Sequence, residues 1–187
     1  TSGSLVFTNT GDNTTVSGLT VAGYGATFDT RHAGTGKTVT LNSLTLGGTN
    51  AANYGVLLTT TDGNGNAAPI TFLADITKAN LSITTGDVTK TYDGTTAVTG
   101  ASAIVATAGA GQTQTQLFAG DSLTGGSFDF TSADVSRDAT TKAVLSNKVV
   151  TVTGVTVNDG NNGGNYNVTY VNNTSSTINP LGVTVTG

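Results

Sequence analysis

The sequence contains no cysteine, no methionine and no tryptophan, and only two of its 187 residues are proline. Without cysteine, neither a disulfide framework nor a thiolate metal site can form. All 11 acidic residues are aspartate, and only seven residues are lysine or arginine. Because glutamate, methionine, lysine and arginine favour helices, their scarcity argues against a helical fold.

Clustered positive charge and long apolar runs are also missing. The net charge is −4, and the seven basic residues stand singly along the chain. Binding to nucleic acid needs grouped basic side chains that neutralise phosphates, so we expect no nucleic-acid partner. No apolar run approaches the roughly 18 residues of a membrane span, and we expect no insertion into a membrane. The first residues carry no signal-peptide pattern, so an exported protein would contain this sequence as an internal piece.

Threonine, valine and glycine take the place of the helix formers, with 26 glycines among 187 residues. Threonine, valine and the aromatic residues fit the pleated, half-buried surface of a strand. Glycine and asparagine clusters separate the short alternating runs, as they do between the strands of β proteins. The sequence therefore predicts an all-β fold.

Residues 87–100 hold the most informative local pattern. Lys90 and Tyr92 alternate with threonines, Asp93-Gly94 interrupts the run, and a second run of threonine and valine follows. Asp-Gly between two such runs predicts a tight turn, because glycine accepts a positive φ without steric cost. We expect the ring of Tyr92 to be buried and its hydroxyl to be hydrogen-bonded.

The second half of the sequence repeats short motifs of the first half in the same order. Residues 128–130, 148–152, 162–166 and 178–187 match residues 26–28, 37–41, 50–54 and 76–86. Matches that keep their order indicate an internal repeat. Each unit is longer than a solenoid coil, so we expect two tandem Ig-like β-sandwich modules in an elongated chain, residues 1–86 and 87–187.

Two features of the repeat bear on its completeness. The first unit has no counterpart of residues 87–100, so either the sequence begins inside a module or residues 1–25 supply a substitute strand. Asn53-Tyr54 and Asn165-Tyr166 occupy matching places, which predicts one core tyrosine beside a turn residue in each unit.

The letters Thr-Lys-Thr-Tyr-Asp-Gly-Thr-Thr at residues 89–96 resemble the opening motif of YDG-type repeats in large bacterial surface adhesins. Further points of resemblance are Ala119-Gly120-Asp121, Gly164-Asn165-Tyr166, Ile178-Asn179-Pro180, Asn53-Tyr54 and residues 33–39. The resemblance implies tandem β-sandwich modules in the stalk of filamentous-haemagglutinin-like adhesins. Gram-negative bacteria secrete such proteins to the cell surface for attachment and biofilm formation. The implied partners are neighbouring repeats and a host receptor or polysaccharide that the sequence does not identify.

We therefore expect a structural stalk region and not an enzyme. His32 is the only histidine, and no G-x-S-x-G nucleophile elbow is present. Two alternatives remain open. A carbohydrate-binding module would present clustered exposed aromatics, whereas the aromatics here are 6% of residues and have the spacing of core positions. A β-solenoid shaft would show a repeat of coil length.

Two loops rich in oxygen-bearing side chains are weak calcium candidates. Asp62, Asn64 and Asn66 alternate as in calcium loops, and Asp159 begins a second loop of this kind. No glutamate closes either loop, and hydrogen-bonded Asx turns explain both without a metal. We expect no cofactor, with calcium at these loops as the alternative. A Lys–Asn isopeptide bond is a further alternative for stiffening a stalk without cysteine.

Overall fold

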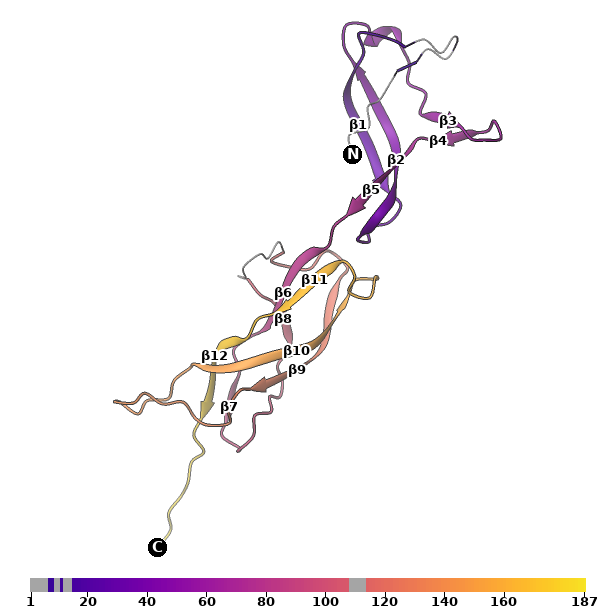
Figure 1. Cartoon of the computed structure of the whole chain (residues 1–187). Coiled ribbons are helices and arrows are strands. Elements are labelled where there is room, and N and C mark those ends of the chain that lie inside the picture. The colour runs from indigo at the N-terminus through magenta and orange to yellow at the C-terminus, as the bar shows by residue number, and fades with distance from the viewer. Residues whose placement is uncertain (1–6, 9–10, 12–14, 108–113) are drawn as a thin grey trace. The chain divides into compact units, whose positions relative to one another are not determined.

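The structure, a computed structural model, describes residues 7–8, 11, 15–107 and 114–187. The chain divides into two compact units, Thr1–Ile76 and Thr77–Gly187. All regular elements of the described residues are strands, apart from one short 3₁₀ turn, η1 (Ala51–Asn53) (Figure 1). The all-β prediction is therefore confirmed. The Ig-like sandwich remains a prediction.

Unit 1 consists of one antiparallel sheet and one hairpin. The sheet has the order β1 (Thr20–Phe28), β2 (Gly34–Gly47) and β5 (Thr71–Ile76), and the hairpin joins β3 (Thr59–Thr61) to β4 (Ala67–Pro69). Two register shifts interrupt the long β1–β2 ladder, and such irregularities increase strand twist. Leu41 is the only buried hydrophobic residue among the described residues of this unit.

Unit 2 contains two sheets. One has the order β7 (Thr89–Thr91), β12 (Asn173–Asn179), β10 (Lys148–Asn158) and β9 (Ser122–Phe130). The other has the order β11 (Tyr166–Tyr170), β6 (Ala79–Thr85) and β8 (Ala103–Val105). The pairs β6–β11 and β7–β12 are parallel, and the remaining pairs are antiparallel.

The hydrophobic core lies in unit 2. One cluster joins Leu81 and Ile83 of β6 to Val152, Val157 and Tyr166. A second cluster, formed by Phe130, Val150 and Ile178, connects β9, β10 and β12. In β6 the consecutive residues 81–83 are all buried, because this strand is covered on both faces and paired on both edges.

The boundary between the units falls between Ile76 and Thr77, whereas the sequence analysis places it between Gly86 and Asp87. The difference concerns β6, which follows β5 after only two residues and reads as its continuation along the sequence. Its hydrogen-bond partners are β8 and β11, which both belong to unit 2. Parallel pairing with a strand more than 80 residues away leaves no local signal in the sequence.

The strand registers of the two units reproduce the internal repeat. Phe28 faces Val39 as Phe130 faces Val150, Ala26 faces Leu41 as Phe128 faces Val152, and Lys37 faces Ala74 as Lys148 faces Ser176. Strands β1, β2 and β5 of unit 1 thus correspond to β9, β10 and β12 of unit 2. The described residues of unit 1 include no strands that correspond to β6, β7 and β8.

Candidate functional site

The turn at residues 90–97 is built at the end of a short parallel strand. Strand β7 pairs with the last residues of β12, with Lys90 facing Ile178, and the Tyr92 amide donates to the Asn179 carbonyl at 2.8 Å. This pairing places the Lys90 ammonium 5.9 Å from the centroid of the Phe130 ring, a cation–π distance. The turn is therefore in contact with the second core cluster through Lys90 and Phe130.

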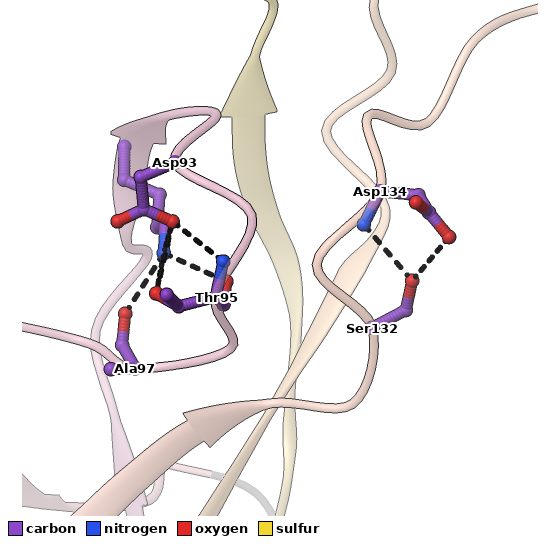
Figure 2. A network of polar contacts seen from close by, with 6 residues as sticks. Asp93, Thr95, Ala97, Ser132 and Asp134 are labelled. Carbon is purple, nitrogen blue, oxygen red and sulfur yellow. Dashed lines mark hydrogen bonds and ion pairs between the residues drawn. The ribbon is translucent and has the colours of Figure 1, made fainter.

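Lys90 is the centre of the polar contacts in this turn, and Figure 2 labels three of its partners, Asp93, Thr95 and Ala97. Its ammonium lies 2.8 Å from an oxygen of Asp93 and donates to the carbonyls of Thr95 at 2.9 Å and Ala97 at 3.1 Å. The same Asp93 oxygen accepts from the amide and the hydroxyl of Thr95, each at 2.9 Å. One lysine and one aspartate thus hold the backbone from residue 93 to residue 97.

The electrostatics of the turn favour an ionised Asp93. The hydrogen bond from Lys90, followed by those from Thr95, lowers the pKa of Asp93 from its ordinary 3.8 to about 2. Gly94 adopts a φ of 77°, the left-handed conformation that glycine accepts without steric cost. The letters Lys-x-x-Asp-Gly-Thr of the motif therefore describe the parts of one hydrogen-bonded turn.

Tyr92 does not occupy the buried position expected for it. Its side chain is 39% exposed, although its amide pairs with β12. Strand β7 ends at Thr91, so Tyr92 lies outside the strand and is not buried with Lys90 against Phe130.

A second polar turn is drawn beside the first in Figure 2. The Ser132 hydroxyl donates to the Asp134 carboxylate at 3.2 Å and accepts from the Asp134 amide at 3.1 Å. These bonds close a local turn after β9. They join Ser132 and Asp134 only and do not involve Lys90 or Asp93.

Tyr166 is buried and doubly hydrogen-bonded. Its hydroxyl donates to Asp121 at 2.7 Å and accepts from the Phe118 amide at 3.0 Å, and its ring stacks on Phe118 at 5.7 Å. Sequence reasoning did not assign a role to Asp121, although the Ala-Gly-Asp match marked its position. Tyr54, the matching residue of unit 1, is 44% exposed, so the two tyrosines have different environments.

Asp159, one of the calcium candidates, is buried within its own loop. Its two carboxylate oxygens accept from the amides of Asn161, Gly163 and Asn165 at 2.8–2.9 Å. Burial opposes ionisation, but these backbone donors outweigh it, and the pKa of Asp159 lies below its ordinary value. The loop therefore wraps its backbone N–H groups around the carboxylate and positions Tyr166 at the start of β11.

The Asp62 loop has the same local chemistry on the surface. Asp62 accepts from the amides of Asn64 at 2.9 Å and Asn66 at 2.8 Å, and the Asn66 side chain lies 3.4 Å from its other oxygen. These bonds, the one from the Asn66 amide first, lower the pKa of Asp62. The structure thus shows Asx turns at both calcium candidates.

Within the described ranges, no group of three or more histidine, cysteine, aspartate or glutamate side chains could hold a metal ion. The same ranges contain no helix long and apolar enough to cross a membrane. Each carboxylate described above is engaged by backbone amides, hydroxyls or one lysine. These arrangements order turns and strand ends.

Both structural units match a known protein family. The family model described as YDG domain matches residues 1–63 and 77–176, one segment in each structural unit. The chain belongs to the YDG domain family. The second YDG match contains the turn of Lys90 and Asp93 and the buried Tyr166, and the first contains β1, β2 and Tyr54. Searches of curated proteins and of solved structures each found no match.

Proposed function

We propose that the chain is a stalk segment of a large adhesin that Gram-negative bacteria secrete to their surface, with two tandem YDG modules of Ig-like type in an elongated arrangement. Its task would be mechanical support of attachment and biofilm formation, without catalysis. The partners would be neighbouring repeats, with a host receptor or polysaccharide bound elsewhere in the longer protein. The adhesin context rests on the resemblance of the sequence motifs.

The observation that carries the proposal is the position of the first and last strands of unit 2. Strand β6 lies between β11 and β8, and strand β12 lies between β7 and β10. Tension along the chain enters unit 2 through β6 and leaves through β12. Because each of these strands is paired on both edges, extraction of either must break two ladders together.

The connection between the units supports the same task. Only Thr77 and Lys78 separate β5, the last strand of unit 1, from β6. A tether of two residues transmits tension with little added length, since one extended residue spans about 3.5 Å.

Single-molecule pulling tests the proposal, and the lack of native cysteine allows the points of attachment to be chosen. One variant carries Thr77→Cys and Asn179→Cys, so that tension acts along β6 and β12. The control carries Ser122→Cys and Asn158→Cys, which face each other at the end of the β9–β10 ladder. All four side chains are exposed.

We expect a higher unfolding force for the first variant, because the control opens its ladder one hydrogen bond at a time from an edge strand. Equal forces, or a lower force along β6 and β12, would contradict a mechanical role for this topology.

A carbohydrate-binding module remains the second candidate, because unit 1 exposes aromatic rings. Tyr24 is 75% exposed, Tyr54 44%, and Phe28 and Phe72 41% each. These aromatic residues are exposed although their spacing in the sequence predicts core positions. Exposed aromatic faces are a common means of contact with sugar rings. Retardation of the chain in gels containing soluble polysaccharides, abolished by Tyr24→Ala, would favour this function over the stalk.

A further inference from the structure

A hollow of about 340 Å³ opens within unit 2, beside the end of β6. Residues 85–89, which lead from β6 into β7, form one wall. Residues 99–102, which lead into β8, form the other wall together with Ile104. Ligand sites in proteins have volumes of about 300–1,000 Å³, so this hollow has the size of a site for a small ligand.

Hydrogen bonds hold both walls of the hollow in place. The hydroxyl of Thr85, which is buried, donates to the Ser102 carbonyl at 3.0 Å and joins one wall to the other. The Val88 amide donates to the hydroxyl of the fully buried Ser176 at 2.9 Å, and the Val88 carbonyl accepts from the Thr177 amide at 2.8 Å. Because the walls are already ordered, a ligand that enters the hollow pays little conformational entropy for ordering them.

Asp87 brings a negative charge to the first wall. One of its carboxylate oxygens accepts from the Asn173 side chain at 2.8 Å and from the Ser175 hydroxyl. These bonds, the one from Ser175 first, lower the pKa of Asp87, so the carboxylate is ionised at neutral pH. Within the described part of the chain, its other oxygen accepts no hydrogen bond and the carboxylate has no ion-pair partner. That second oxygen is therefore available to a hydrogen-bond donor of a ligand.

Thr89, Thr99 and Ser102 add three hydroxyl groups to the lining. Among the residues that the structure describes, none of these hydroxyls has a hydrogen-bond partner. A hydroxyl can both donate and accept, whereas an ionised carboxylate only accepts. The hydroxyls of a sugar complement this combination, because they also donate and accept. An ammonium or guanidinium group only donates, and an anionic ligand is repelled by Asp87.

We propose that this hollow binds one ring of a neutral polysaccharide. The available oxygen of Asp87 accepts from a sugar hydroxyl, and the threonine and serine hydroxyls of the walls bind the neighbouring sugar hydroxyls. Val88 and Ile104 supply apolar surface for the C–H groups of the ring, and Ile104 is 44% exposed. The site lies in unit 2 and shares no residue with the exposed aromatics of unit 1. The argument is independent of the stalk proposal.

Titration of the full chain with single sugars, followed by the backbone amide signals in NMR spectra, tests the proposal. The probes are glucose, galactose and N-acetylglucosamine. We expect at least one of them to shift the amide signals of residues 86–89 and 99–102 in a saturable way and to leave the signals of unit 1 unchanged. Glucuronate should bind more weakly than glucose, because its carboxylate is repelled by Asp87.

Two substitutions alter the hollow itself. Asp87→Asn keeps an oxygen that accepts from Asn173 and Ser175 but removes the charge. We expect it to weaken binding about tenfold, the value of a hydrogen bond to a charged group. A Cβ at Gly86 meets no atom within 4 Å, so the side chain of Gly86→Leu fits without a clash. Because Gly86 lines the hollow, this leucine should occupy the space of the sugar and abolish the shifts.

Two matched controls make the same changes outside the hollow. Asp134→Asn removes a carboxylate from the turn after β9. Gly63→Leu adds a leucine in the β3–β4 hairpin, where a Cβ also meets no atom within 4 Å. Both controls, and Tyr24→Ala in unit 1, should bind the sugar as the parent chain does.

Three results would overturn the proposal. One is the absence of a saturable shift with all three sugars, including the case in which n-butylammonium shifts the same amides and so assigns the hollow to a cationic side chain. Another is binding that is unchanged in both Asp87→Asn and Gly86→Leu. The third is loss of binding in Tyr24→Ala, which would place the sugar on the aromatic rings of unit 1.

Discussion

Lys90 brings one ammonium group to the Asp93 carboxylate and to the carbonyls of Thr95 and Ala97. Replacing it with methionine keeps the aliphatic stem over Phe130 but removes all of these bonds. We expect Lys90→Met to lower the free energy of unfolding of unit 2 by about 1–2 kcal/mol, the net value of a few hydrogen bonds to a charged group near the surface.

Urea unfolding followed by the NMR signals of Tyr166 would measure this change in unit 2. Lys78→Met is the control, because the Lys78 side chain is exposed in the connection between the units. A loss of stability as large in Lys78→Met as in Lys90→Met would contradict the role of the turn.

Asp93 gives this turn a pH dependence with a defined sign. Its pKa in the folded protein is about 2, below its ordinary 3.8. A carboxylate with a lowered pKa stabilises the fold fully above its unfolded value and loses this contribution as the pH falls through the folded value. We therefore expect the stability of unit 2 to decrease between about pH 4 and pH 2.

In Asp93→Asn the part of this decrease that comes from the turn should disappear, while the stability at pH 7 should be lower than in the parent chain. Asp134→Asn removes a carboxylate from the neighbouring turn, where it accepts from Ser132. If Asp134→Asn flattened the acid response as much as Asp93→Asn, the assignment to the turn of Lys90 would be wrong.

Asp159 and Asp62 make similar bonds in loops of different burial. Asp159 is 1% exposed and accepts from three backbone amides, whereas Asp62 lies at the surface. In Asp159→Ala the three amides lose their acceptor inside the protein, which we expect to cost about 2–4 kcal/mol. Asp62→Ala should cost much less, because water replaces the lost acceptor. Equal losses in thermal unfolding of the two variants would contradict this account.

The same two variants test whether calcium binds at these loops. Backbone amides already donate to the carboxylate oxygens of Asp62 and Asp159. A cation would have to replace these donors in order to bind the same oxygens. We expect the unfolding midpoint of the parent chain to be the same in calcium and in EDTA. A rise with calcium that Asp159→Ala or Asp62→Ala abolishes would establish a metal site at that loop.

At the scale of single elements, β6 contributes two buried side chains, Leu81 and Ile83, to the first core cluster of unit 2. Leu81 of β6 is 1% exposed, whereas Leu73 of β5 is 70% exposed. Leu81→Ala should lower the free energy of unfolding by about 2–4 kcal/mol through lost burial and a residual cavity. Leu73→Ala removes the same atoms from the surface and should change stability by less than about 0.5 kcal/mol. Urea unfolding of both variants checks the difference, and similar losses would exclude β6 as the central strand.

The strands themselves were largely predictable from the sequence. Alternation of threonine with valine or leucine marks β2 and β10, Ala26-Thr27-Phe28 and Phe128-Asp129-Phe130 mark the ends of β1 and β9, and Asp93-Gly94 marks the turn after β7. The partners of the strands were not predictable in the same way. Strand β6 pairs with a strand more than 80 residues away. Its hydrogen-bond partners β11 and β8, and not its position in the sequence, assign it to unit 2.

The sites show the same division between local and distant information. The bonds of Asp62 and Asp159 lie within six residues, so the Asx turns could be expected from the spacing of asparagine and glycine. The contact between Asp121 and Tyr166 joins residues 45 apart, and Tyr54 is 44% exposed although it has the matching place in the repeat. Sequence reasoning therefore assigned both tyrosines to the core.

At the scale of the whole molecule, the two YDG units differ in the strands that the structure describes. Unit 2 has counterparts for every strand of the unit 1 sheet β1-β2-β5, and it also contains β6, β7, β8 and β11, which have no counterpart among the described strands of unit 1. Of the ten buried hydrophobic residues in the described part of the chain, nine lie in unit 2 and the tenth is Leu41. Since buried apolar surface is the main source of stability, the two units should differ strongly in resistance to opening.

Hydrogen exchange of the full chain, followed residue by residue, tests this central claim most directly. The account predicts slow exchange in β6 and β10 of unit 2, and fast exchange in β1 and at residues 54–58 of unit 1. Equal protection of the two units would contradict the account, because the difference in buried apolar side chains would then not set their resistance to opening.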